Sequence, residues 1–186
     1  REVSFQAGRS SRSNDDHRDT LCLAKVPAFG YNTYWLEGDS EAKAPKELGN
    51  TDDLFMENKY MSVEFDSQTG FIKSLVDKNT GVDYADENFL AIPTVIEDSK
   101  TDTWAHNVFK FHNVKGLMEL VSIDRVENGA LRSVIRTVHK FNDSYLTQEF
   151  ILAKGQKTLK VDCKAMWQEK FTLLKFAFPI GGNDEI

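Results

Sequence analysis

The chain has 186 residues, of which 40% are hydrophobic and thirteen are Phe, so it can bury a core and need not stay disordered. Its formal net charge is −6 and its pI is about 5.3, which provides no basic face for nucleic acid or for an anionic membrane surface. No run of the sequence approaches the roughly 18 consecutive apolar residues that a membrane span requires.

The first block, residues 1–36, contains two apolar runs at residues 21–26 and 31–36, with a Pro/Gly corner at residues 27–30 between them. Pro presets φ and Gly accepts positive φ, so the sequence predicts two strands joined by a turn. The chain begins at Arg1 without Met, and we expect the N-terminus of the protein to lie elsewhere.

The second block, residues 37–53, is crowded with Asp, Glu and Lys and contains no aromatic residue. Such a segment cannot bury enough apolar surface to offset the entropy lost on ordering, so it is predicted to be a linker or a long exposed loop. It divides the chain into a short first part and a larger part, residues 54–186.

Two D-x-x-x-G segments follow, at residues 66–70 and 77–81. The first lies between the alternating run 61–65 and the apolar run 71–76. Because Gly supplies the positive φ that a tight turn needs, the pattern predicts successive antiparallel hairpins.

Further along, short polar or Gly-containing breaks separate five apolar-alternating runs. Asn128-Gly129 is the strongest hairpin signal among the breaks. We therefore predict a meander of five long antiparallel strands and an all-β antiparallel sandwich. The predicted strands are residues 117–126, 131–141, 145–152, 158–167 and 171–178.

Within the fourth run, the odd positions from Leu159 to Trp167 are apolar, and we expect them to face the core. The two cysteines, Cys22 and Cys163, each lie inside an apolar run and are not in a C-x-x-C pair. We expect both to be buried free thiols, with a disulfide or a metal role as the alternatives.

The densest polar cluster is at residues 97–106, where acids, hydroxyls, an indole and an imidazole occur together. Carboxylates bind sugar hydroxyls, and an indole packs on a pyranose face, so this cluster is a candidate wall of a substrate cleft. A polar loop anchored by one Trp would show the same composition. The candidate cleft residues are Asp98, Asp102, Trp104 and His106.

Two other interpretations of this cluster remain open. Asp98, Asp102 and His106 are all zinc-ligating types at a spacing of four, but no helical stripe exploits that spacing, and we predict no metal site. Glu97, Asp98 and Asp102 could in principle form a glycosidase carboxylate pair. The chain has 29 acidic residues, so chance proximity is expected, and we assign no catalytic residue.

The histidines outside this cluster do not indicate a general base. His139 shares a strand face with Ile135, Thr137 and Phe141, which favours a packed, hydrogen-bonded imidazole. The sequence also lacks the G-x-S-x-G, H-E-x-x-H, Walker and Rossmann patterns.

Four segments and one longer motif resemble glycoside hydrolase family 38, the α-mannosidases, in the order of that family. The longer motif, residues 167–176, is similar to the family's W-x-E-R/K-x-x-L-L-K signature. The four segments are the corner Val26-Pro27-Ala28-Phe29-Gly30-Tyr31, the stretch Met56-Glu57-Asn58-Lys59-Tyr60, the turn Asp66-Ser67-Gln68-Thr69-Gly70-Phe71-Ile72 and the loop Asp102-Thr103-Trp104-Ala105-His106. The chain departs from the family pattern at Ala28, Ala105 and Lys170.

The resemblance implies a galactose-mutarotase-like β-supersandwich, preceded in residues 1–36 by the end of a small β-domain. It also implies a parent enzyme that hydrolyses α-mannosides with retention, using an aspartate nucleophile and a divalent metal, usually zinc. Those residues belong to an N-terminal catalytic domain, and no catalytic or metal position of this chain matches its motifs. The resemblance favours a cytoplasmic setting, although the sequence itself does not identify the compartment.

We therefore expect a non-catalytic β-rich fragment of an α-mannosidase, with the N-terminal catalytic domain and an α-mannoside as its partners. The family continues beyond this point with further strands, so an unpaired sheet edge and a homo-oligomer formed through it are also expected. The alternatives are an autonomous carbohydrate-binding module, with Trp104, Trp35 or Tyr34 as the sugar platform, and an aldose-epimerase-like enzyme. The last requires His112 and His139 to converge with an acid on one sheet face.

Overall fold

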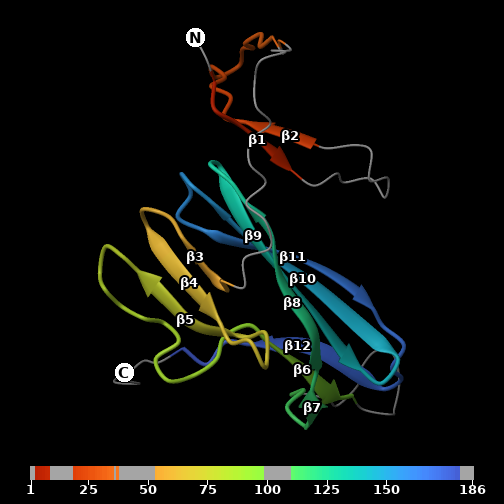
Figure 1. Ribbon diagram of the computed structural model, residues 1–186. Helices are drawn as coiled ribbons and strands as arrows, with labels where there is room; N and C mark the ends of the chain where they lie inside the picture. Colours follow the sequence, from red (N-terminus) through yellow and green to blue (C-terminus); the bar gives the residue numbers. More distant parts are fainter. Residues whose placement is uncertain (1–2, 9–18, 36, 38–52, 99–109, 181–186) are drawn as a thin grey trace.

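The computed structural model describes residues 3–8, 19–35, 37, 53–98 and 110–180, which form strands, turns and loops (Figure 1). They contain twelve strands in four antiparallel sheets. This confirms the predicted all-β antiparallel sandwich. Within these ranges no helix is long and apolar enough to cross a membrane.

The largest sheet is a four-stranded meander in the order β11-β10-β9-β8. It confirms four of the five predicted long strands, with ends shifted by a few residues at most. The turn predicted at Asn128-Gly129 closes a hairpin as expected, because the Gly129 amide donates to the Arg132 carbonyl at 3.0 Å. The strands are β8 (Glu119–Asn128), β9 (Arg132–Phe141), β10 (Ser144–Ala153) and β11 (Leu159–Met166).

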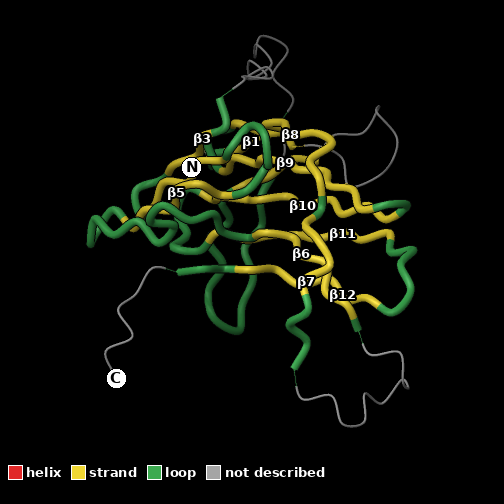
Figure 2. The backbone as a smooth tube through the Cα atoms, turned by 90° about the horizontal axis from the view of Figure 1, so that it is seen from below, coloured by secondary structure: helices red, strands yellow, loops and turns green. Residues whose placement is uncertain are grey.

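The fifth predicted strand exists as β12 (Thr172–Ala177), but it does not continue the meander. It pairs with β6 (Ile92–Glu97), which also pairs with β7 (Val114–Leu117), and Figure 2 shows these three strands together. Leu174 and Phe176 pack in one cluster with Leu146 of β10. A strand beside β11 in the same sheet could not face β10 in this way, so the prediction of a five-stranded meander was wrong.

A third sheet contains β3 (Phe55–Glu57), β4 (Met61–Phe65) and β5 (Ile72–Asp77). Both predicted turns are confirmed, with Gly70 at φ 70° and Gly81 at φ 75°. In each turn the glycine amide donates to the carbonyl of the leading aspartate, at 2.8 Å in the first turn and 2.7 Å in the second. The side chain of each aspartate also accepts from a backbone amide two residues on.

The core lies between the meander and the two three-stranded sheets and has two parts. In the first, Val63 and Phe65 of β4 pack against Ile135 of β9 and Phe150 of β10. The Phe65 and Phe150 rings meet edge-on with centroids 4.8 Å apart. In the second, Val95, Met118 and Leu146 are buried, with Trp167 packed against them. Strands β9 and β10 therefore connect the two parts of the core.

The first block differs from its prediction. Strand β2 (Asp19–Cys22) pairs with β1 (Phe5–Gly8), while the described residues 31–35 form no strand. The corner itself is confirmed, because the Gly30 amide donates to the Pro27 carbonyl at 3.2 Å. Beyond it, the Tyr34 hydroxyl donates to the Lys25 carbonyl at 2.9 Å and accepts from the Lys25 amide at 2.7 Å. These side-chain bonds take the place of a strand ladder.

The division of the chain at residues 37–53 stays a prediction, because most of that segment lies outside the described residues. Its end is anchored by Arg125 of β8, a buried arginine. The Arg125 Nε donates to the Asp53 carbonyl at 3.0 Å, and the guanidinium also bonds the Phe55 carbonyl and the Asp53 carboxylate. The third sheet thus starts at a fixed point on the meander.

The predicted burial of the apolar face of β11 is confirmed only at its two ends, where Leu159 and Trp167 pack against the core, and the predicted burial of both cysteines was wrong. Val161, Cys163 and Ala165 are exposed, although each lies directly opposite a buried residue of β10. Cys22 is also an exposed free thiol. The physical reason is the position of each strand: β11 is at a sheet edge, and β2 belongs to a two-stranded ribbon, so neither has the cover that a central strand receives.

Candidate functional site

Of the four candidate cleft residues, the structure places only Asp98. Asp102, Trp104 and His106 lie outside the described residues. Asp98 directly follows β6, and its backbone amide donates to the Phe171 carbonyl at 2.9 Å. The structure therefore shows where the candidate segment leaves β6.

Strand β12 and the turn before it hold both flanks of that segment. On the leading side is the contact between Asp98 and Phe171. On the trailing side, the Lys175 ammonium donates to the Phe111 carbonyl and lies 5.8 Å from the centre of the Phe111 ring. The Glu97 amide also donates to the Asn113 carbonyl at 2.8 Å. Both described flanks of the candidate segment thus contact residues 167–176, the stretch that carries the family resemblance.

The acidic residue of that stretch, Glu169, connects two turns. Its carboxylate accepts from Asn142 Nδ2 at 3.0 Å and from Ser144 Oγ at 3.2 Å. Ser144 is fully buried, and its Oγ accepts from the Gln168 amide at 2.9 Å. The β9–β10 turn is therefore bonded to the chain leaving β11, which gives Glu169 a structural role at the corner.

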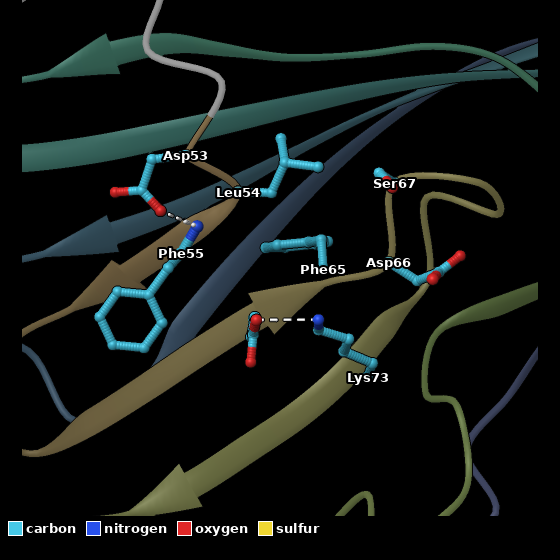
Figure 3. A pocket seen from close by; sticks show the side chains of 8 residues that line it. Asp53, Leu54, Phe55, Phe65, Asp66, Ser67 and Lys73 are labelled. Atoms are coloured by element: carbon cyan, nitrogen blue, oxygen red, sulfur yellow. Dashed lines mark hydrogen bonds and ion pairs between the residues drawn. The ribbon is translucent and has the colours of Figure 1, made fainter.

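A separate pocket of about 310 Å³ opens beside β3, β4 and the turn at residues 66–70. Figure 3 shows its lining side chains. None of them was a candidate site residue in the sequence, because only the turn signal marked this region. The pocket is lined by Asp53, Leu54, Phe55, Glu64, Phe65, Asp66, Ser67 and Lys73.

The three carboxylates of this pocket all have partners. Glu64 pairs with Lys73 at 2.8 Å, and Asp53 pairs with Arg125 at 3.3 Å (Figure 3 shows the first pair). Asp66 accepts from the Thr69 hydroxyl at 2.7 Å, and this hydrogen bond lowers the pKa of the Asp66 carboxyl. Groups engaged in this way stabilise local structure, and the pocket offers no poised acid and base.

The interior position predicted for His139 is confirmed. The ring is fully buried, its Nε2 lies 2.8 Å from the Thr69 carbonyl, and it stacks on Phe71 with centroids 5.6 Å apart. Desolvation lowers the pKa of His139. His112 is exposed. Because the His139 ring is inaccessible, these two histidines do not supply the convergent pair that epimerase chemistry requires.

The described residues contain no group of three or more His, Cys, Asp or Glu side chains that could hold a metal ion. The zinc that the resemblance implies for the catalytic region of the parent therefore has no ligand set in the described part of this chain. Asp102 and His106, which suggested a metal spacing, lie outside that part.

The comparisons with known proteins agree with the fold. The family model described as the glycosyl hydrolases family 38 C-terminal domain matches residues 56–185. A search of curated proteins finds no significant match. The matched range begins in β3, includes all the sheets of the sandwich and contains the stretch at residues 167–176. The chain therefore belongs to glycosyl hydrolase family 38, and most of it is the C-terminal domain of that family.

Proposed function

We propose that this chain is a non-catalytic part of an α-mannosidase, which supports the catalytic domain and presents the segment after Asp98 to the substrate cleft. The observation that carries the proposal is the family match, which is to the C-terminal domain. The mannoside specificity rests on the resemblance of the turn, corner and tryptophan motifs to those of α-mannosidases.

The exposed surface of the first block fits a domain contact. Phe29 and Trp35 are among several large apolar side chains that lie open to solvent along residues 23–35, with Trp35 85% exposed. Several exposed apolar side chains along one short segment, rather than scattered singly, are typical of protein contacts. The flanks of the 99–109 segment, by contrast, are fixed on β12 and the turn before it, as a rigid support for a binding loop requires.

The direct test is an aryl α-mannoside assay of the purified chain with added zinc, compared with a mock preparation. No turnover above the mock is expected. Turnover that copurifies with the chain would contradict the non-catalytic role. The coding sequence upstream of Arg1 provides an independent check, because the proposal requires an aspartate- and histidine-bearing catalytic region in the same reading frame.

A second candidate is an autonomous carbohydrate-binding module, and the exposure of Trp35 favours it. An open indole can pack on a pyranose face. Calorimetric titration with mannose and mannobiose at millimolar concentration separates the two candidates. Binding that is lost in Trp35→Ala and kept in Phe29→Ala would support the module, and flat titrations would reject it.

A further inference from the structure

The first block contacts the meander through the side chain of Gln6, in β1. Figure 1 shows β1 and β2 beside the hairpin end of β8 and β9, residues 127–132. Gln6 is 6% exposed, whereas its neighbour Phe5 is 56% exposed. The polar residue of this strand is thus turned inward and the aromatic residue outward, the reverse of ordinary burial. The inward position therefore serves hydrogen bonding rather than apolar packing.

The carboxamide of Gln6 is hydrogen-bonded through both of its polar atoms. Its Oε1 accepts from the Leu131 amide at 2.8 Å and from the Arg132 amide at 2.9 Å. Its Nε2 donates to the Arg132 carbonyl at 3.1 Å and to Glu127 Oε2 at 3.4 Å. Among side chains, only Asn and Gln combine an acceptor oxygen with two N–H donors on one planar group. The hairpin end is therefore complementary to a primary amide.

The other walls of this seat are fixed. The Glu127 carboxylate accepts two bonds from the Arg132 guanidinium, at 2.7 and 2.8 Å, and its side chain is 8% exposed. A bidentate pair of this kind holds the carboxylate in one orientation. Gly129 leaves room for the ligand, because a Cβ at that position would overlap the Gln6 carboxamide. The site thus has defined donors, acceptors and volume.

We propose that the hairpin end is a carboxamide-binding site, that Gln6 is its ligand, and that this contact fixes the orientation of the first block on the sandwich. Where both partners are described, every hydrogen bond between the first block and the sandwich involves Gln6. Gln6 is therefore a positioning residue. It sets the direction in which the open apolar side chains of residues 23–35 are presented, and the inference rests on the proposed function only for the domain that they contact.

The two exposed free thiols allow a direct test, because Cys22 lies in β2 and Cys163 lies in β11. Nitroxide labels on both thiols report the distribution of distances between the first block and the meander by pulsed electron paramagnetic resonance. We expect one narrow peak for the unaltered chain. Gln6→Met removes the amide donors and the carbonyl acceptor, and Gly129→Ala displaces the amide from its seat. Each variant should replace the narrow peak with a broad distribution.

Gly155→Ala is the matched control for Gly129→Ala. Neither glycine has positive φ, and nothing lies within 4 Å of a Cβ at Gly155, so this variant should keep the narrow peak. Gly129→Ala also leaves the sequence of β1 and β2 unchanged, so its broad distribution would not come from a damaged ribbon. Circular dichroism in urea checks that the sandwich stays folded in each variant.

Hydrogen exchange provides a second measurement at the site itself. The backbone amides of Leu131 and Arg132 should exchange roughly tenfold faster in Gln6→Met and Gly129→Ala, as expected for a lost hydrogen bond. A broad distribution in the unaltered chain overturns the proposal, as does a narrow peak in either variant. These measurements do not involve α-mannoside turnover, so failure of the orienting contact is distinguishable from failure of the proposed function.

Discussion

At the scale of single residues, the turn at residues 66–70 contacts β9. Its D-x-x-x-G pattern is a local sequence signal, but its glycine also fits a tertiary contact. The glycine of the D-x-x-x-G pattern, Gly70, is required by its positive φ and also by its neighbours. A Cβ at this position would lie 2.6 Å from Leu120 Cδ1 and 3.2 Å from His139 Nε2. The turn therefore lies directly on the buried histidine.

Replacing this glycine should destabilise the chain through both effects. We expect Gly70→Ala to cost more than Gly81→Ala, because both positions have positive φ but nothing lies within 4 Å of a Cβ at Gly81. The backbone term alone is of order 1–3 kcal/mol. Urea denaturation of the two variants measures the difference, and equal midpoints would show that the crowding at Gly70 has no energetic effect.

The buried imidazole should make stability depend on pH. The His139 Nδ1 has no hydrogen-bond partner within the described part of the chain, and desolvation lowers the pKa of the ring below its usual 6.5. The unfolded chain then binds the proton more tightly than the folded chain. Stability from this group is complete above about pH 6.5 and is lost progressively as the pH falls towards the lower folded pKa.

Urea midpoints measured from pH 7.5 to pH 5 check this dependence. His139→Asn should flatten the curve in that range, at the expense of a lower midpoint at pH 7.5. His112→Asn, at an exposed position, should leave the slope unchanged. A slope that persists in the His139 variant would assign the dependence to other groups.

At the scale of elements, the stretch at residues 167–176 joins one layer to the other. It leaves β11, bonds the β9–β10 turn through Glu169, and enters β12 in the opposite sheet. The backbone of Phe171 has positive φ, 52°, where the chain changes direction. The sequence predicted a corner here, and it also predicted correctly that Trp167 packs in the core.

The Glu169 bonds should contribute measurably to this corner. Glu169→Ala removes the acceptor of the buried Ser144 hydroxyl, and we expect a loss of about 1–3 kcal/mol in the free energy of unfolding. Lys170→Ala, an exposed neighbour in the same motif, is the matched control and should change it little. A double-mutant cycle with Ser144→Ala isolates the pair, and additive losses would argue against a direct coupling.

At the scale of the whole molecule, two core clusters share one central sheet. Ile135 and Phe150 belong to the first cluster, whereas Leu146, from the same strand as Phe150, belongs to the second. Because β9 and β10 cannot lose one cluster without disturbing the other, the described sandwich should unfold as one cooperative unit.

A substitution in one cluster should therefore weaken the other. Phe150→Ala removes the partner of Phe65 and is expected to cost about 3–5 kcal/mol. In a Trp35→Phe, Trp104→Phe background, the fluorescence of Trp167 reports on the second cluster. Its transition should shift with the circular-dichroism transition, and a Trp167 transition that stays in place would reveal two independent units.

The sequence by itself determined the long strands of residues 117–178, the two D-x-x-x-G turns and the family, because alternation and turn chemistry are local and act within a few residues. It predicted His139 as an interior residue for the same reason. It located the candidate loop but identified neither the pocket beside β3 nor the anchoring role of Arg125. Arg125 bonds a residue 72 positions away in the chain, and the pocket combines residues 53–55, 64–67 and 73, so neither feature is recorded in a single local pattern.

Only the tertiary structure decided which sheet receives β12 and what covers each strand face. An apolar alternating strand has the same pattern whether its inner face meets a core, as in β10, or solvent, as in β11. Burial depends on the layer that packs opposite, and strand pairing depends on partners distant in sequence. For that reason Cys163 and Val161 were predicted inside and lie at an open edge.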